Sequence, residues 1–397
     1  MKRIITLFCF VVSMLPIVIG TTFAQDLSRQ NGNKTADSIL TEISNAKSDT
    51  SRVSLMNKIL YTTNSLSQQE RIDYSKKILY LAKKQHDRVL ESIITADLGY
   101  IIAINGNNLL GSELAFSALE MAQQHKNKQA LGIIYQDLAI CFRDDSVKRK
   151  QFLFKALPNS EAAGDYGNLA AILNTLSRYY SSVQSKDSAL YYAQRAYELC
   201  LTRNVEENLL HSMIQLAKIH YYDLNSKAIA FEYMRKALDT KYGIENADAF
   251  VTVNINLAGL FQSEGNLDSA LHYTNRARGR LEKARFRSSL DVYALYKNIY
   301  SSVNSDSALK YYKLYETVKD SIDKMSDVQQ QQLLSIKKEL EMEKMAVERK
   351  QNIQYALLGL GIITFVILFL ALSRRHITNT KLIQFLGVVA LLVVFEF

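Results

Sequence analysis

A small or apolar residue recurs at intervals of 38 to 41 residues along most of this chain, and this regularity restricts the possible folds more than any other feature. The recurring positions are Ile78, Ala118, Ala156, Ala196, Ala237, Ala277 and Tyr315. A period of this length indicates one supersecondary unit that is copied and stacked, because each copy buries its apolar face only against its neighbours. The sequence therefore predicts an array of repeats.

The spacing inside each repeat is helical. A large and a small residue stand side by side, an aromatic residue follows one turn later, and three small residues come after it, as in Leu257, Ala258, Phe261, Ala270, Thr274 and Ala277. Residues 176–196 and 295–315 have the same spacing. Small residues at i, i+4 and i+7 share one helix face, so each repeat is predicted to be a helical hairpin. We expect the turns and the N-caps of the second helices at Gly265-Asn266, Asp187, Asp268 and Asp306.

The composition agrees with a chain made of helices. Its 397 residues include 2 Pro and 15 Gly, whereas average usage would give about 20 and about 28. Folds rich in β-structure need both residues for their turns, so a sandwich or a barrel is excluded. Pro158 is expected near the end of a second helix, and Gly99 at a site of close helix packing.

The segment NLAGLFQSEGNLDSALHYTNRA, residues 256–277, resembles a tetratricopeptide repeat (TPR), and looser copies share its register over roughly residues 37–320. The resemblance implies an all-α, TPR-type superhelical solenoid of about seven helical hairpins. It also implies a binding scaffold whose partner differs from one protein to the next. The period exceeds the usual 34 residues of the family, so we expect longer helices. The Trp and the terminal Pro of the family pattern are absent.

TPR geometry further implies a groove lined by residues of the first helices. These are Tyr100, Gln136, Arg143, Asn174, Arg178, Lys218, Tyr221, Tyr293 and Lys297. Arg178, Lys218 and Lys297 occupy equivalent places in their repeats. Such a basic row could hold acidic side chains or a peptide carboxylate; the alternative is an ordinary solvated helix face.

No motif for catalysis or cofactor binding is present in the sequence. Residues 106–112 (GNNLLGS) superficially resemble a phosphate-binding loop but lack its Lys, and we interpret them as a turn between repeat helices. The histidines are scattered singly, and His220 stands where the repeat needs a packing residue. Cys141 and Cys200 have no metal-ligand spacing. We therefore expect no enzyme activity, no cofactor and no metal.

The first 24 residues have the pattern of a secretory signal peptide. Lys2 and Arg3 precede an apolar run, and Thr22-Phe23-Ala24 forms a small-x-small cleavage site. The alternative is an amino-terminal anchor that is not cleaved. The net charge of +9 is interspersed along the chain, so nucleic-acid binding is not expected.

Residues 355–372 form an uncharged apolar run of about 27 Å as a helix, which predicts a transmembrane helix. The leader is expected to direct export of the solenoid, residues 25–319. Residues 373–382 are expected to form a basic linker on the cytoplasmic side. Residues 320–354 are predicted to be a coiled-coil-like helix that either supports a homodimer and transmits movement or acts as a spacer. Residues 383–397 are a second apolar segment, which as it stands would be a short span or a membrane-surface hairpin arm. Either the sequence is truncated here, or a longer relative continues through this second span.

The whole pattern resembles the exported TPR proteins of Gram-negative bacteria, with periplasmic repeats and a following transmembrane helix in the cytoplasmic (inner) membrane. Two functions are compatible with it. The first is a membrane-anchored periplasmic scaffold that binds a protein or peptide partner. The second is the sensor half of a signalling receptor of the histidine-kinase or DNA-binding type, whose output domain is absent from this chain.

Overall fold

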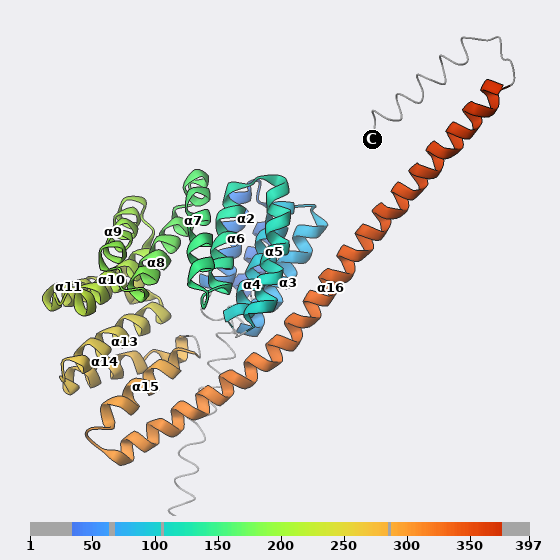
Figure 1. The fold of residues 1–397 in the computed structure, drawn as a ribbon. Helices are drawn as coiled ribbons and strands as arrows, with labels where there is room; N and C mark the ends of the chain where they lie inside the picture. The colour runs from blue at the N-terminus through green and yellow to red at the C-terminus, as the bar shows by residue number, and fades with distance from the viewer. Residues whose placement is uncertain (1–33, 63–67, 105–106, 285–286, 375–397) are drawn as a thin grey trace, which may run out of the picture. The chain divides into compact units, whose positions relative to one another are not determined.

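The computed structural model describes residues 34–62, 68–104, 107–284 and 287–374, and these ranges contain helices and turns but no β-strand (Figure 1). The expected all-α fold is therefore confirmed. The chain divides into two compact units, Met1–Gln331 and Gln332–Phe397. The predicted signal peptide, residues 1–24, and the predicted second apolar segment, residues 383–397, lie outside the described residues, as does most of the basic linker, residues 373–382.

The described part of the first unit is a succession of helical hairpins (Figure 1). It begins with a helix over residues 34–45, followed by α2 (Asp49–Asn57), the π-helical turn η1 (Lys58–Thr62) and α3 (Gln68–Lys84). The first helices of the next hairpins are α4 (Arg88–Ile104), α6 (Lys128–Cys141), α8 (Tyr166–Ser182), α10 (Glu206–Lys218), α13 (Ala247–Ser263) and α15 (Ser288–Tyr300). Their second helices are α5 (Asn108–His125), α7 (Ser146–Ala163), α9 (Lys186–Arg203), α11 (Lys227–Asp239), α14 (Leu267–Arg278) and the start of α16 (Ser305–Arg374).

Shorter elements complete the chain between these hairpins. The π-helical turn η2 (Ile219–Asp223) continues α10, α12 (Lys241–Glu245) precedes α13, and the 3₁₀ turn η3 (Leu281–Lys283) precedes α15. Each first helix packs against its second helix and against the next first helix. The result is a helical repeat solenoid.

The predicted repeat register agrees with the burial of the recurring positions. Six of the seven have side chains with no exposed surface: Ile78, Ala118, Ala156, Ala196, Ala237 and Ala277. Tyr315 is partly exposed. The small residues of the second helices therefore lie where the paired helices meet, because only a short side chain fits between two closely packed backbones.

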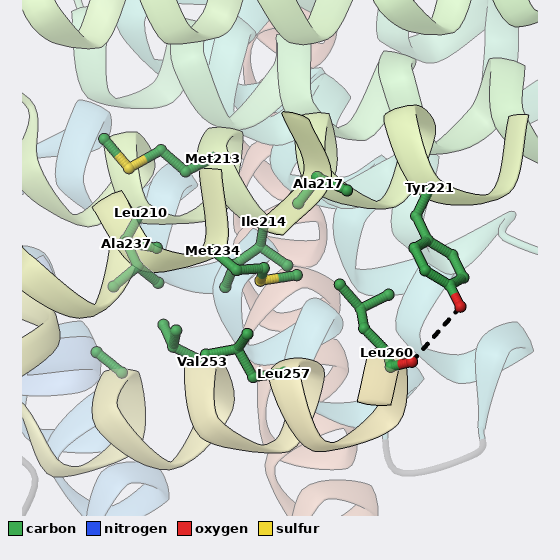
Figure 2. Packing of buried hydrophobic residues seen from close by; sticks show 12 residues of the cluster. Leu210, Met213, Ile214, Ala217, Tyr221, Met234, Ala237, Val253, Leu257 and Leu260 are labelled. Atoms are coloured by element: carbon green, nitrogen blue, oxygen red, sulfur yellow. Dashed lines mark hydrogen bonds between the residues drawn. The ribbon is translucent and has the colours of Figure 1, made fainter. Parts of the chain in front are cut away.

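Large residues of the first helices fill the space between successive hairpins. Figure 2 shows this packing where α10, α11 and α13 meet: Leu210 and Ile214 of α10 lie beside Met234 of α11 and Val253 of α13. Their side chains are almost completely buried. Since the same packing recurs from hairpin to hairpin, the core is a continuous strip along the solenoid.

A close contact between α4 and α5 involves two glycines. A Cβ atom on Gly99 of α4 would lie 2.6 Å from the carbonyl oxygen of Gly111 on α5, and a Cβ on Gly111 would lie 2.5 Å from the carbonyl oxygen of Gly99. Neither position has room for a side chain. The expectation that Gly99 stands at a site of close packing is confirmed.

Two local expectations need correction. Pro158 does not stand at the end of a second helix, since α7 continues to Ala163 and ends at Gly164 in the left-handed conformation (φ 66°). Asp187, Asp268 and Asp306 are not N-caps but lie in the first turns of α9, α14 and α16. Ser185 is the N-cap of α9, and the expected Asn266 is that of α14, where it accepts a hydrogen bond from the Ser269 amide. An acidic residue in the first turn still interacts favourably with the helix dipole.

Helix α16 is continuous over 70 residues, from Ser305 to Arg374. Its start packs on α15 through Tyr311, whose ring stacks on Tyr296 at 4.3 Å between centroids. The predicted juxtamembrane helix, residues 320–354, therefore continues without a break into the predicted span, residues 355–372. Of the described helices, this one contains a segment long and apolar enough to cross a membrane, Glu348–Phe369, with a mean hydropathy of 1.9.

Candidate functional site

Six residues occupy the same place in successive first helices, two positions after the leucine of the repeat motif. They are Tyr100, Ile140, Arg178, Lys218, Gly259 and Lys297, and we refer to them as the inner row. Consecutive first helices pack against one another, so the row follows one wall of the solenoid. Tyr100 and Arg178 are two hairpins apart, and yet Tyr100 acts electrostatically to raise the pKa of Arg178. Tyr100 and Arg178 are therefore within electrostatic reach of each other.

Arg178 and Lys218 form the centre of the row. Both side chains are exposed to solvent, although desolvation lowers the pKa of both, and the charge of Arg178 lowers the pKa of Lys218 further. The two observations fit together if each cation stands in a groove, where water reaches it but protein surrounds it. In the described part of the chain, Arg178 donates a hydrogen bond from Nη2 to Thr175 Oγ1 (3.0 Å), and neither cation contacts a carboxylate.

Arg149 is a third cation at this site and was not among the predicted groove residues. It lies near the start of α7, desolvation lowers its pKa, and its charge lowers the pKa of Arg178. The run Lys148-Arg149-Lys150 was a signal in the sequence, but α7 is a second helix and the prediction considered only first helices. We refer to Arg149, Arg178 and Lys218 as the basic cluster.

Two carboxylates act electrostatically on the basic cluster, Asp144 on Arg149 and Asp291 of α15 on Lys218. Asp291 is exposed in the first turn of that helix. Desolvation raises its pKa, while the charges of Arg287 and Lys218 act to lower it. Lys218 and Asp291 are thus within electrostatic reach of each other, although they form no ion pair.

Two predicted groove residues instead connect neighbouring hairpins. Asn174 is 3% exposed; it accepts a hydrogen bond from Ser212 Oγ (3.1 Å) and donates one to the carbonyl oxygen of Asn208 (3.4 Å). Tyr221 is 8% exposed and donates its hydroxyl hydrogen to Glu264; burial, followed by this carboxylate, raises the pKa of Tyr221 to about 12. Little of either side chain is left for a ligand.

The remaining predicted residues lie apart from the basic cluster. Lys297 Nζ stands 4.7 Å from the centroid of the Tyr315 ring, and Tyr293 stacks on Tyr311 with centroids 6.4 Å apart. Arg143 is exposed just after α6 and lies near Asp144. Gln136 Oε1 is buried without a hydrogen-bond partner in the described part of the chain. The structure thus brings together Arg178, Lys218 and Tyr100, but not the whole predicted set.

Two buried carboxyl groups occupy equivalent positions on α4 and α6, directly before the motif leucines. Burial raises the pKa of Asp97 to about 7. It also raises the pKa of Asp137 well above its usual value, and the neighbouring charge of Asp97 adds to that shift. Asp137 Oδ2 has no hydrogen-bond partner among the described residues. The sequence could have indicated these groups, because both aspartates directly precede a motif leucine on a first helix.

The described residues contain no group of three or more His, Cys, Asp or Glu side chains arranged to hold a metal ion. His220 stacks on Tyr233 with 5.8 Å between ring centroids, and burial lowers its pKa. This is the packing position that the repeat pattern predicted for it. What the inner wall offers chemically is a group of three cations, Arg149, Arg178 and Lys218, that form no ion pair within the described ranges.

Comparisons with known proteins identify the fold and no family. No family model matches the sequence, and no curated protein sequence matches it. The Rap protein complexed with Competence and Sporulation Factor is similar in structure over 72% of this chain and 80% of its own, with 13% identity and a TM-score of 0.51.

Two further solved structures match with lower scores. The Rap conjugation gene regulator of plasmid pLS20, in complex with the Phr* peptide, matches 78% of this chain and 96% of its own, with 12% identity and a TM-score of 0.47. A STAND protein with a tetratricopeptide repeat sensor, from Pyrococcus horikoshii, matches with 16% identity and a TM-score of 0.46 over 70% of this chain, which spans about half (47%) of that protein. The likeness to the Rap protein complexed with Competence and Sporulation Factor agrees with the stacked hairpins described above, and the chain has the fold of a helical repeat solenoid.

Proposed function

We propose that this chain is a non-enzymatic, membrane-anchored scaffold that binds a protein or peptide through the inner row of its solenoid. The solenoid lies on the periplasmic side of the cytoplasmic membrane, and the predicted span, residues 355–372, is the anchor. The observation that carries the proposal is the basic cluster. Its three cations, on α7, α8 and α10, are within electrostatic reach of one another in sequence, Arg149 of Arg178 and Arg178 of Lys218, and none of them contacts a carboxylate in the described part of the chain.

The physics of the basic cluster favours an anionic ligand. Like charges repel one another within the basic cluster, and desolvation makes each charged form less favourable. A carboxylate that enters the groove relieves both effects, and a guanidinium can hold it with two parallel hydrogen bonds. The Rap protein, which has a similar fold, is complexed with Competence and Sporulation Factor. We therefore take a short acidic peptide as the first probe.

The test measures binding of a fluorescein-labelled peptide that ends in two glutamates to the full chain purified in detergent. Reversal of two charges, Arg178→Glu with Lys218→Glu, is expected to weaken binding at least about tenfold, because loss of charge-assisted contacts is compounded by repulsion. The matched control is Lys128→Glu with Lys241→Glu. It changes the net charge equally at two exposed first-turn positions of α6 and α12. Equal affinity of the two double variants would remove the groove from the proposal.

The continuity of α16 supports the second function, the sensor half of a receptor. The same helix begins as the last hairpin of the solenoid and ends beyond the predicted span, so a ligand-dependent movement of that hairpin would reach the span through one continuous helix. Reading the coding sequence past codon 397 distinguishes the two functions. An in-frame kinase or DNA-binding module would favour the sensor, and an immediate natural stop would favour the scaffold.

A further inference from the structure

Gly259 interrupts the inner row with a gap. Its neighbours in the row, Lys218 on α10 and Lys297 on α15, have long side chains, whereas a Cβ atom on Gly259 would meet nothing within 4 Å. The carbonyl oxygen of Gly259 accepts a hydrogen bond from Ser263 Oγ (3.0 Å). The floor of the gap is therefore bare helix backbone, which we refer to as the glycine notch.

No packing constraint in the structure requires glycine at this position. Glycine inside a helix is unfavourable relative to alanine, and at Gly99 the close approach of α5 explains it. At Gly259 the surroundings are open. A glycine that is not needed by the fold and lies on the inner wall leaves room for something to approach the helix closely.

Groups of opposite charge lie on the first helices before and after α13, the helix that carries the notch. Lys218 precedes it on α10, and Asp291 follows it on α15; both are exposed. They act on each other electrostatically, but neither makes a hydrogen bond or an ion pair with another described residue. Gln262 lies one turn after Gly259, and its side-chain amide also has no hydrogen bond within the described ranges.

We propose that the main chain of a bound peptide crosses the glycine notch, with an acidic group of the peptide on Arg178 and Lys218 and a cationic group on Asp291. This inference rests on the proposed function and specifies its ligand: a peptide with a positive charge a few residues from its negative charge. An extended strand advances about 3.3 Å per residue. The amide of Gln262 can donate to and accept from a peptide group that passes over the notch.

The two probes are fluorescein-labelled synthetic peptides that differ in one residue. Both contain two glutamates and a Ser-Gly-Ser spacer; the bipolar peptide continues with lysine and the acidic peptide with alanine. The full chain has a net charge of +9, so nonspecific attraction favours the acidic peptide. We expect the opposite preference, with the bipolar peptide binding about threefold to fivefold tighter, as for one partly exposed ion pair.

Two substitutions test the two halves of the inference separately. Asp291→Asn should abolish the preference for the bipolar peptide while leaving the affinity for the acidic peptide nearly unchanged. Gly259→Gln should weaken binding of both peptides about tenfold. Its side chain would fill the notch, and the change favours the helix rather than disturbing it. The matched control is Gly167→Gln in the first turn of α8, where a Cβ atom meets only Asp165 Oδ1 at 3.7 Å. It should leave both affinities unchanged.

The outcomes separate this inference from the function on which it rests. Suppose that binding of the acidic peptide depends on Arg178 and Lys218. If the bipolar peptide then binds no tighter than the acidic one, or still binds tighter in Asp291→Asn, the inference is overturned and the proposed function stands. Unchanged binding by Gly259→Gln overturns the notch in the same way. If neither peptide depends on Arg178 and Lys218, then the proposed function itself fails and the inference fails with it.

Discussion

Gly99 and Gly259 are both glycines inside first helices, but substitution by alanine should lower the stability of the chain at Gly99 and raise it at Gly259. Alanine at Gly99 would place a Cβ atom 2.6 Å from a backbone oxygen of α5, and overpacking of this kind costs about 1–3 kcal/mol. Alanine at Gly259 meets open space and should stabilise the helix by about 0.5–1 kcal/mol. Thermal denaturation of the full chain, followed by circular dichroism, measures both. Shifts of the same sign would contradict this account of the two sites.

Asp137 should make the stability of the solenoid depend on pH. Burial raises its pKa above the unfolded value, so the folded chain retains this proton longer than the unfolded chain does. Stability is therefore undiminished below the unfolded pKa and falls as the pH rises toward the folded value. Asp137→Asn removes this loss. We expect the variant to be more stable than the parent at pH 8 by about 1–3 kcal/mol, and nearly equal to it at pH 4.

Asp145 is a control, because its contribution to stability should change with pH in the opposite direction. It caps α7 by accepting a hydrogen bond from the Lys148 amide, and that bond is the main reason that its pKa is lowered. Its contribution is present above the unfolded pKa and is lost as the pH falls through the folded value. Asp145→Asn should therefore lower the unfolding midpoint more at pH 7 than at pH 3. A common pH profile for the two variants would show that burial at Asp137 is not the cause.

At the scale of elements, the hairpins could be predicted because a helix pair needs small residues at fixed spacing, and that need is written in the local sequence. Ala196 and Ala237 were assigned to buried positions by register alone, and both are fully buried. The groove depends instead on which neighbouring helix a side chain meets. Asn174 and Tyr221 had groove positions by register, but polar partners on the next helices, at Asn208 and Glu264, hold them inside. No local pattern specifies such partners.

The second helix α7 contains the most testable deviation from an ideal hairpin. Pro158 lies in its interior, where it cannot donate a hydrogen bond to the carbonyl oxygen of Phe154, one turn earlier. Pro158→Ala restores that donor at an exposed position. We expect a gain of about 1–3 kcal/mol, measured as a higher unfolding midpoint in denaturant. A loss of stability would mean that the proline shapes α7 for its contacts with α6 and α8.

At the scale of the whole molecule, the buried cysteines allow a direct test of the proposed membrane topology. Cys141 and Cys200 are 3% and 0% exposed. Burial, as the largest cause, raises the pKa of Cys141 to about 12 and that of Cys200 to about 11. Thiolate is the reactive form of cysteine. The native solenoid should therefore not react with a maleimide reagent, and an introduced cysteine reports its own location without background.

Two single cysteines, one in the solenoid and one after the predicted span, test the topology. Lys128→Cys lies on the exposed first turn of α6, and Arg374→Cys lies at the end of α16. In intact spheroplasts treated with a membrane-impermeant maleimide, we expect Lys128→Cys to be labelled at once and Arg374→Cys only after lysis. A leader that directs export of the solenoid, and basic residues that stay on the cytoplasmic side after the span, predict this order of labelling. Labelling of both before lysis would contradict the span, and labelling of Lys128→Cys only after lysis would contradict export of the solenoid.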